Sequence, residues 1–345
     1  MVITDLEQVT PEWLTEVLTR NGFIEQGAVA SVELDAEKTN TAQVARLLLT
    51  WTDGTKTHVS RRLFLKLADF RREIDFYQTV VPSMKATPLI LNCYDAEYDA
   101  EAEAGHLLVE DVSTTHRPSA HTLPPSTPRY EMLINALAQF HAAWWDHPRI
   151  DGDIGELAGD IHETTLARAR DGLRGFFDFM GDRMSDERRA IFKRVFERWP
   201  PRHYHERMAR GKGLTIIHGD AHAWNFLYPR DPETHRVRIL DWAMWQVGLA
   251  TNDLAYMIAM HDFPDYRSRM ERPLVRHYYD RLVDLGVESY TWDDCWLDYR
   301  LSAIHNLFFP VYHWVVQGDP ALWWPNLERA MLAYQDLRCE DLLDL

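Results

Sequence analysis

The chain has 345 residues, 46% of them apolar and 12% aromatic, which indicates a globular protein long enough for two lobes with separate cores. Its formal net charge of −16 argues against a nucleic-acid partner, because such partners are held by clustered Lys and Arg. The acidic balance tolerates a cationic small molecule. It repels an anion such as ATP, so a nucleotide site would need local Lys or Mg²⁺.

The three cysteines, Cys93, Cys295 and Cys339, lie far apart and form no CxxC pair. Their spacing argues against a disulfide framework or a zinc knuckle and fits a reducing cytosol, so we expect a cytoplasmic protein. The N-terminal segment has no basic patch followed by an apolar stretch, and no apolar run approaches 18 residues. We therefore expect neither secretion nor contact with a membrane.

The first elements along the chain are a helix and then strands. In TPEWLTEVLTRNGF, Thr10 and Pro11 predict a helix start, and Asn21-Gly22 predicts its end. Strand-like runs follow in QVARLLLTW, RRLFLKL and GHLLVEDVS, with TDGT as a hairpin turn signal after the first and RREIDFYQTVV as a helix between the others. Residues 30–112 are therefore expected to form a small antiparallel sheet with one inserted helix.

A loop with four prolines, THRPSAHTLPPSTP, then separates this sheet from a helical region. We predict an N-lobe at 1–112, a hinge and linker at 113–128, and a helical C-lobe at 129–345. Helical patterns cover 127–145, about 155–208 and most of 250–342, and the short strand-like runs LTII and VRILDW lie between them. This order is typical of an α+β, bilobal, protein-kinase-like fold.

The stretch LTIIHGDAHAWNFLY carries the densest group of reactive side chains. Asp220 and Asn225 have the spacing D-x-x-x-x-N, and Asp241 follows sixteen residues later in ILDW. Phosphoryl transfer needs a carboxylate that orients the attacking hydroxyl and accepts its proton, together with oxygen ligands for Mg²⁺. Asp220 suits the first task, and Asn225 and Asp241 suit the second. The protein-kinase catalytic loop has the same interval between Asp and Asn.

The motif HGDAHAWN, followed by ILDWAMWQVGLATNDLAYM, resembles the aminoglycoside phosphotransferase-like superfamily of small-molecule kinases. That group includes choline-kinase-like members, and the second stretch looks closest to the ecdysteroid-kinase-like branch. The resemblance implies that Asp220 is the catalytic base and that Asn225 and Asp241 bind Mg²⁺. It also implies that His218 holds the backbone of the loop and that Asp253 is a buried brace.

The N-terminal half carries matching features. Taken alone, Lys66 in LFLKL reads as the solvent side of a half-buried strand. With Glu73 in RREIDFY, it resembles the Lys–Glu pair of the superfamily, in which the Lys contacts the nucleotide phosphates. LLVEDVS resembles the hinge, which implies that main-chain groups near Glu110 to Val112 bind the adenine edge.

The expected phosphate loop, EKTNTAQ, contains no glycine. Protein kinases use glycines at this place so that backbone amides approach phosphate, so the departure argues against a protein kinase. By resemblance, Thr39, Asn40 and Thr41 would donate hydroxyl, amide or backbone hydrogen bonds there.

Other functions fit the same residues less well. His218, Asp220 and His222 could bind a metal, but the two histidines flank Gly219 and follow a strand, rather than sharing a helix face. No G-x-S-x-G supports a hydrolase, and no G-x-G-x-x-G supports a dinucleotide fold. The role of His222 stays open.

The C-terminal half would supply the acceptor site. Its Trp and Tyr residues could stack on a ring or a quaternary ammonium, although aromatics at helical spacing usually form core. Asp293, Asp294 and Asp298 could meet an amine.

Together these features predict an ATP- or GTP- and Mg²⁺-dependent kinase. It would transfer the γ-phosphoryl group to a hydroxyl of an aminoglycoside-like or other small alcohol. The alternative is a non-catalytic kinase-like protein that binds nucleotide or acts as a scaffold. The sequence sets no oligomeric state.

Overall fold

The computed structural model describes residues 2–38, 42–68, 71–84, 87–119, 123–158 and 161–343. The chain divides into two compact units, Met1–Pro118 with Phe226–Ala243 and Ser119–Asn225 with Met244–Leu345. Residues Phe226–Ala243, which follow the predicted catalytic loop, thus group with the N-terminal unit rather than with the helical one. The predicted lobe boundaries at 112 and 128 stay a prediction.

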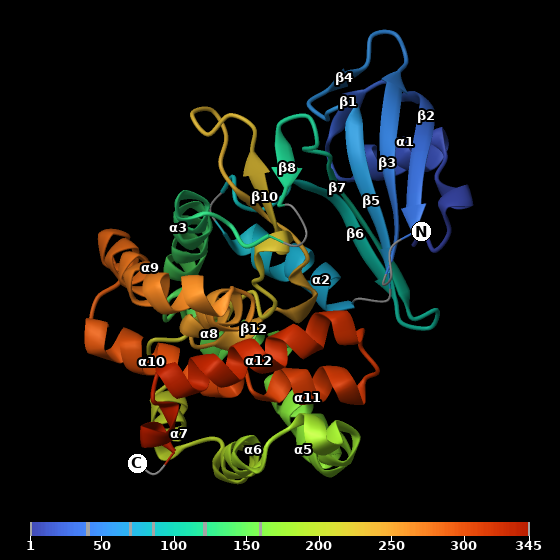
Figure 1. Cartoon of the computed structure of the whole chain (residues 1–345). Coiled ribbons are helices and arrows are strands. Elements are labelled where there is room, and N and C mark those ends of the chain that lie inside the picture. Colours follow the sequence, from blue (N-terminus) through green and yellow to red (C-terminus); the bar gives the residue numbers. More distant parts are fainter. Residues whose placement is uncertain are drawn as a thin grey trace. The chain divides into compact units, whose positions relative to one another are not determined.

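The first unit is built on a five-stranded antiparallel sheet with the strand order β2-β3-β5-β7-β6 (Figure 1). The strands are β2 (Val29–Lys38), β3 (Gln43–Trp51), β5 (Arg62–Ala68), β6 (Cys93–Asp99) and β7 (Ala104–Glu110). Alternate residues of β3, namely Ala45, Leu47 and Leu49, are buried, because successive side chains of a strand point to opposite faces. The predicted small sheet is confirmed.

Helix α1 (Pro11–Arg20) covers the core face of this sheet and begins and ends as predicted. The Thr10 hydroxyl accepts a hydrogen bond from the Trp13 main-chain N–H, which satisfies one of the otherwise unpaired amides at the helix start. The buried stripe of α1 packs on leucines of β3 and β5 in one core cluster.

The TDGT segment is a turn, but its role differs from the predicted hairpin. It leads into β4 (Lys56–Thr57), which pairs with β1 (Ile24–Gln26) in a separate two-stranded sheet. Strands β3 and β5 do pair, with Leu48 opposite Arg62, through a longer connection that includes β4. A turn signal is local, and it does not specify which strand the chain meets afterwards.

The rest of the first unit frames Lys66 and Asp241. Helix α2 (Arg71–Asp75) continues as the π-helix η2 (Phe76–Val80) and the short turn η3 (Val81–Ser83). A second sheet has the order β11-β10-β8, made of β11 (Arg238–Ile239), β10 (Phe226–Pro229) and β8 (His116–Pro118). The predicted strand VRILDW is thus only two residues long. Its last residue, Trp242, begins the 3-10 helix η7 (Trp242–Met244).

The second unit is mainly helical, as predicted (Figure 1). Its α-helices among the described residues are α3 (Thr127–Trp144), α4 (Asp153–Ala158), α5 (Ile161–Met180), α6 (Asp186–Arg198), α7 (Arg202–Ala209), α8 (Thr251–Ala255), α9 (Pro264–Asp284), α10 (Trp292–His305), α11 (Phe308–Val315) and α12 (Pro320–Asp336). A π-helix, η8 (Tyr256–Met260), follows α8 directly. Strands β9 (Thr215–Ile217) and β12 (Gln246–Gly248) pair antiparallel, and β9 leads into the predicted catalytic loop.

No helix among the described residues is both long and apolar enough to cross a bilayer. All three cysteines are free thiols.

Candidate active site

Lys66 bridges two carboxylates of the first unit. Its Nζ lies 2.6 Å from Glu73 Oε2 on α2 and 3.0 Å from Asp241 Oδ1 in the segment after β11. Leu65 and Leu67 on the same strand point into the core, so Lys66 projects from the opposite face of the sheet. Burial by itself lowers the pKa of Lys66, but the two carboxylates outweigh it and raise the pKa, so the ammonium stays charged.

Glu73 is buried and joins the helix to the Asp241 segment. Its Oε1 accepts a hydrogen bond of 3.3 Å from the Trp242 main-chain N–H. The Trp242 ring stacks on Phe76 at 4.0 Å between centroids. Burial raises the pKa of Glu73, and the Lys66 charge partly offsets this rise. The Asp241 backbone has φ 59°, a left-handed conformation that a non-glycine residue adopts only where its surroundings impose it.

The predicted hinge has few free main-chain groups. The Glu110 carboxylate accepts the Asn92 N–H and pairs with Arg238 at 3.2 Å, so its side chain is used within the unit. The Val112 carbonyl accepts the Thr115 N–H. Within the described part of the chain, the Val112 N–H has no hydrogen-bond partner and can donate to a ligand.

The predicted phosphate-loop residues Thr39, Asn40 and Thr41 lie outside the described residues. The strands before and after them, β2 and β3, pair with Lys38 opposite Gln43.

In the second unit, the loop that follows β9 is braced by one buried carboxylate. Asp253 on α8 accepts hydrogen bonds from the main-chain N–H groups of His218 (2.7 Å) and Gly219 (2.9 Å). His141 Nε2 donates to the same side chain at 3.1 Å. Burial alone would raise the pKa of Asp253, but the hydrogen bond and charge of His141, with the neighbouring His218, lower it. Asp253 therefore stays ionised and holds the loop, as the resemblance implied.

Gly219 is required by the shape of this loop. Its φ of 80° lies in the left-handed region, and a Cβ at this position would lie 2.1 Å from the Met244 carbonyl oxygen. The next residue is fixed from the other side, because His218 Nδ1 accepts the Asp220 main-chain N–H at 3.2 Å. The tight turn thus sets the direction in which Asp220 leaves the loop.

Asp220 and Asn225 contact each other across the loop. Asn225 Nδ2 donates to the Asp220 carbonyl oxygen at 2.8 Å and to Asp220 Oδ2 at 3.2 Å. Asn225 Oδ1 accepts no hydrogen bond from the residues that the structure describes, which leaves an oxygen suited to a hard cation. The Asp220 side chain is 29% exposed, so its carboxylate is accessible.

Aromatic and imidazole side chains surround Asp220 in its own unit, and sequence reasoning missed most of them. Burial, followed by the nearby Asp220 charge, raises the pKa of Tyr256. His261 lies 4.6 Å from Tyr256 between ring centroids, and burial lowers its pKa to about 3. Burial also lowers the pKa of His313, whereas the nearby Asp220 charge raises it in part. Tyr256 lies in η8, His261 follows η8 directly and His313 lies in α11, so no local pattern links these residues to the loop.

The metal-site alternative gains no support from the described residues. Within them, no group of three or more His, Cys, Asp or Glu side chains is placed to hold a metal ion. The buried His218 ring already accepts the Asp220 main-chain N–H.

The ecdysteroid kinase-like family model matches residues 27–288, about three quarters of the chain. The chain belongs to this family.

Several solved structures share the fold of this chain. An assigned aminoglycoside phosphotransferase from Ralstonia eutropha has a TM-score of 0.59 at 14% identity, over 94% of this chain and 97% of that one. The gentamicin complex of APH(2")-IIa has a TM-score of 0.50 at 13% identity, over 98% and 97%. A thermostable mutant of APH(4)-Ia with ADP and hygromycin B has a TM-score of 0.50 at 11% identity, over 95% and 98%. At such identities the likeness shows the protein-kinase-like fold alone.

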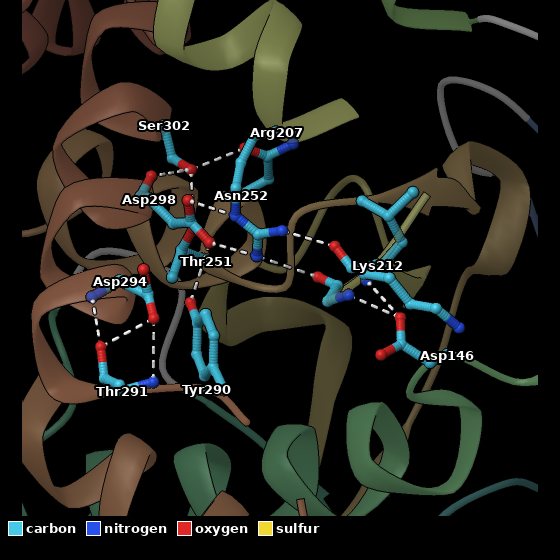
Figure 2. A network of polar contacts seen from close by, with 12 residues as sticks. Asp146, Arg207, Lys212, Thr251, Asn252, Tyr290, Thr291, Asp294, Asp298 and Ser302 are labelled. Atoms are coloured by element: carbon cyan, nitrogen blue, oxygen red, sulfur yellow. Dashed lines mark hydrogen bonds and ion pairs between the residues drawn. The ribbon is translucent and has the colours of Figure 1, made fainter. Parts of the chain in front are cut away.

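In this ecdysteroid kinase-like chain, two of the three aspartates expected to meet an amine are used elsewhere (Figure 2). Asp298 is buried, lies 2.9 Å from Arg207 Nη2 and accepts the Tyr290 hydroxyl at 3.0 Å. Asp294 caps the start of α10 by bonding Thr291. Helical spacing placed these residues on α10, but only packing shows that Asp298 faces the interior.

Proposed function

We propose that the chain is a Mg²⁺-dependent small-molecule kinase that transfers the γ-phosphoryl group of ATP or GTP to a hydroxyl. The observation that carries the proposal is the bonded set Lys66–Glu73–Asp241 in one unit, together with Asp220 and Asn225 on one braced loop in the other. A scaffold protein needs neither of these two sets of residues. Their retention favours an enzyme over the non-catalytic alternative.

Asp220 would orient the acceptor hydroxyl and accept its proton. Its carboxylate is accessible, and the loop that carries it is fixed by Asp253 and His218, so little reorganisation is needed. A positioned general base contributes on the order of 10²–10⁴ in rate.

Lys66 would contact the nucleotide phosphates, and the Val112 N–H would bond the adenine edge. Glu73 would keep Lys66 in place, because the Glu73 side chain is buried and accepts a hydrogen bond from Lys66 Nζ. Thr39, Asn40 and Thr41 complete the proposed nucleotide contacts, with the main chain near Glu110.

Each predicted Mg²⁺ ligand has the chemistry that the ion needs: Asp241 offers a carboxylate with a side chain 45% exposed, and Asn225 offers an amide oxygen that accepts no hydrogen bond from the described residues. Bound Mg²⁺ would offset the negative charge on the β- and γ-phosphates. Lys66 now pairs with Asp241, so the ammonium would exchange this carboxylate for phosphate when the nucleotide binds.

The proposed acceptor is an uncharged alcohol with an apolar, ring-bearing body. Tyr256 and His222 lie near Asp220 within its unit, and the His222 ring lies next to His261, whose pKa of about 3 leaves it neutral at pH 7. The buried Asp298 offers no carboxylate to an amine. Gentamicin and hygromycin B, which structural neighbours bind, are therefore less suitable acceptors for this chain.

The test is a Mg²⁺-dependent turnover assay with ATP and GTP across steroid-like alcohols, sugars, amino alcohols and aminoglycosides. We expect transfer to at least one uncharged alcohol, a loss of two to four orders of magnitude in Asp220→Asn, and no change in the control Asp280→Asn on the exposed side of α9. Nucleotide binding without transfer to any acceptor would support the scaffold alternative. If the protein binds no nucleotide in the presence of Mg²⁺, the kinase proposal is wrong.

A further inference from the structure

His222 is the residue of the HGDAHAWN motif to which the proposed chemistry assigns no role. Its Nε2 lies 3.5 Å from Asp220 Oδ2. Its Nδ1 is buried and has no hydrogen-bond partner in the described part of the chain. The imidazole lies among other rings, with centroid distances of 5.1 Å to Trp224, 5.5 Å to His261 and 6.5 Å to Tyr256.

The surroundings of the ring decide its tautomer. A neutral imidazole carries one N–H donor and one acceptor nitrogen. The proton belongs on Nε2, because only this nitrogen faces an acceptor, the Asp220 carboxylate. With this tautomer, Asp220 Oδ2 has two donor groups nearby: Asn225 Nδ2, which hydrogen-bonds it at 3.2 Å, and His222 Nε2 at the longer distance of 3.5 Å.

We propose that His222 is a positioning residue for the proposed kinase reaction. Its Nε2–H, together with Asn225 Nδ2–H, holds Oδ2 of Asp220 and leaves Oδ1 to meet the acceptor hydroxyl. This inference rests on the proposed function. It gives a base that is oriented before the acceptor arrives, which is how enzymes lower the entropic part of a barrier.

The main chain of His222 has a separate task, which makes the side-chain role testable. Its N–H donates to the Asp220 carbonyl oxygen at 2.8 Å, and its carbonyl oxygen accepts the Asn225 N–H at 3.0 Å. These bonds shape the loop whatever side chain stands at position 222. A substitution there therefore alters the donor or the ring without removing the turn.

Two variants separate a hydrogen-bond donor from simple ring packing. His222→Phe keeps a ring among Trp224, Tyr256 and His261 but removes the donor. His222→Gln removes the ring but places an amide N–H near the position of Nε2. His277→Gln serves as the matched control, since His277 lies on the exposed side of α9 and bonds Asn135.

The measurement is kcat and KM for nucleotide and acceptor on the full chain with Mg²⁺, with thermal unfolding of each variant. We expect kcat to fall on the order of tenfold or more in His222→Phe, the scale of a lost hydrogen bond to a charged group, with nucleotide KM within about twofold. His222→Gln should recover most of this loss, and His277→Gln should match the wild type. The proposal is overturned if Phe is as active as His, or if Gln is no faster than Phe.

The same experiment separates this inference from the proposed function. Wild-type turnover together with unchanged kcat in His222→Phe rejects only the positioning role. Absence of transfer by the wild type to every acceptor rejects the kinase function and the positioning role with it.

Discussion

Asp253 Oδ2 accepts a hydrogen bond of 2.7 Å from the main-chain N–H of His218, across 35 residues of sequence. Its other oxygen, Oδ1, accepts the Gly219 N–H, and His141 on α3 donates to Oδ2. One buried carboxylate thus ties the turn before Asp220 to two helices. The loop is thus held by this carboxylate as well as by hydrogen bonds among its own residues.

Asp253→Asn should destabilise the protein by about 2–4 kcal/mol, because an amide group would face main-chain donors that need an acceptor, and a buried unsatisfied group is costly. Urea unfolding at pH 7 measures the free energy of unfolding. The control Asp280→Asn, which is half-exposed on α9, should change it by less than about 0.5 kcal/mol. Equal unfolding midpoints for Asp253→Asn and the wild type would show that the brace is dispensable.

Gly219→Ala should lower the free energy of unfolding by more than the strain of placing an alanine in the left-handed region. The new Cβ would lie 2.1 Å from the Met244 carbonyl oxygen, so the loop or β12 must shift. Gly286 has a similar φ of 91° with no atom within 4 Å of its added Cβ, and Gly286→Ala should cost only about 1 kcal/mol of strain. Thermal unfolding of both variants compares them, and similar losses would contradict the close approach to Met244.

Asp298→Ala should destabilise the protein by about 3–5 kcal/mol, because Arg207 would lose its partner in a largely buried setting (Figure 2). The double variant Arg207→Met with Asp298→Leu should lose less than Asp298→Ala, since no uncompensated charge remains. Asp280→Ala removes the partner of Arg276 in an exposed ion pair, and it should lower the free energy of unfolding by about 0.5 kcal/mol or less. Denaturant unfolding of the three variants tests this order. A double variant that is less stable than Asp298→Ala contradicts it.

Asp262 should make stability fall as the pH rises. Its carboxyl group is buried, its Oδ2 has no hydrogen-bond partner among the described residues, and burial raises its pKa from 3.8 to about 6. Between these values the unfolded chain releases the proton while the folded chain keeps it, so the free energy of unfolding decreases with pH. The full effect is about 3 kcal/mol and is complete above pH 6.

Asp262→Asn removes this titration, so the stability of the variant relative to the wild type should increase from pH 4.5 to pH 7.5. Urea unfolding at both pH values measures the difference. The exposed Asp265, three residues away, provides the control Asp265→Asn, for which the difference should not change with pH. A difference for Asp262→Asn that stays constant with pH would contradict the prediction.

Several local features of the fold could be predicted from the sequence. Thr10 and Pro11 start α1, and the alternating pattern of QVARLLLTW forms β3 over the same residues. The segment that contains Glu73 is helical, and Thr127 begins α3. Caps, turns and periodicity act over a few residues, so a single sequence carries them in full.

Contacts between residues far apart in the sequence could not be predicted in this way. The strand after the TDGT turn pairs with β1 rather than continuing a hairpin with β3, because backbone pairing partners are chosen by packing. Asp298 stands in an acidic, tryptophan-rich segment typical of a solvated helix face, yet it is buried against Arg207. Tyr256 and His261 meet the Asp220 loop through a π-helix that no spacing rule predicts.

The sequence by itself determined most of the elements and their order, and it predicted which residues would perform phosphoryl transfer, because propensities, caps and motif spacings are local properties. The tertiary structure decided which charges are paired, which are buried and which side chains surround Asp220. It placed Lys66 between Glu73 and Asp241, removed Asp298 from the set of acceptor contacts and brought His222 to Asp220 Oδ2. Burial and pairing depend on residues far apart in the chain, and only the folded packing brings those residues together.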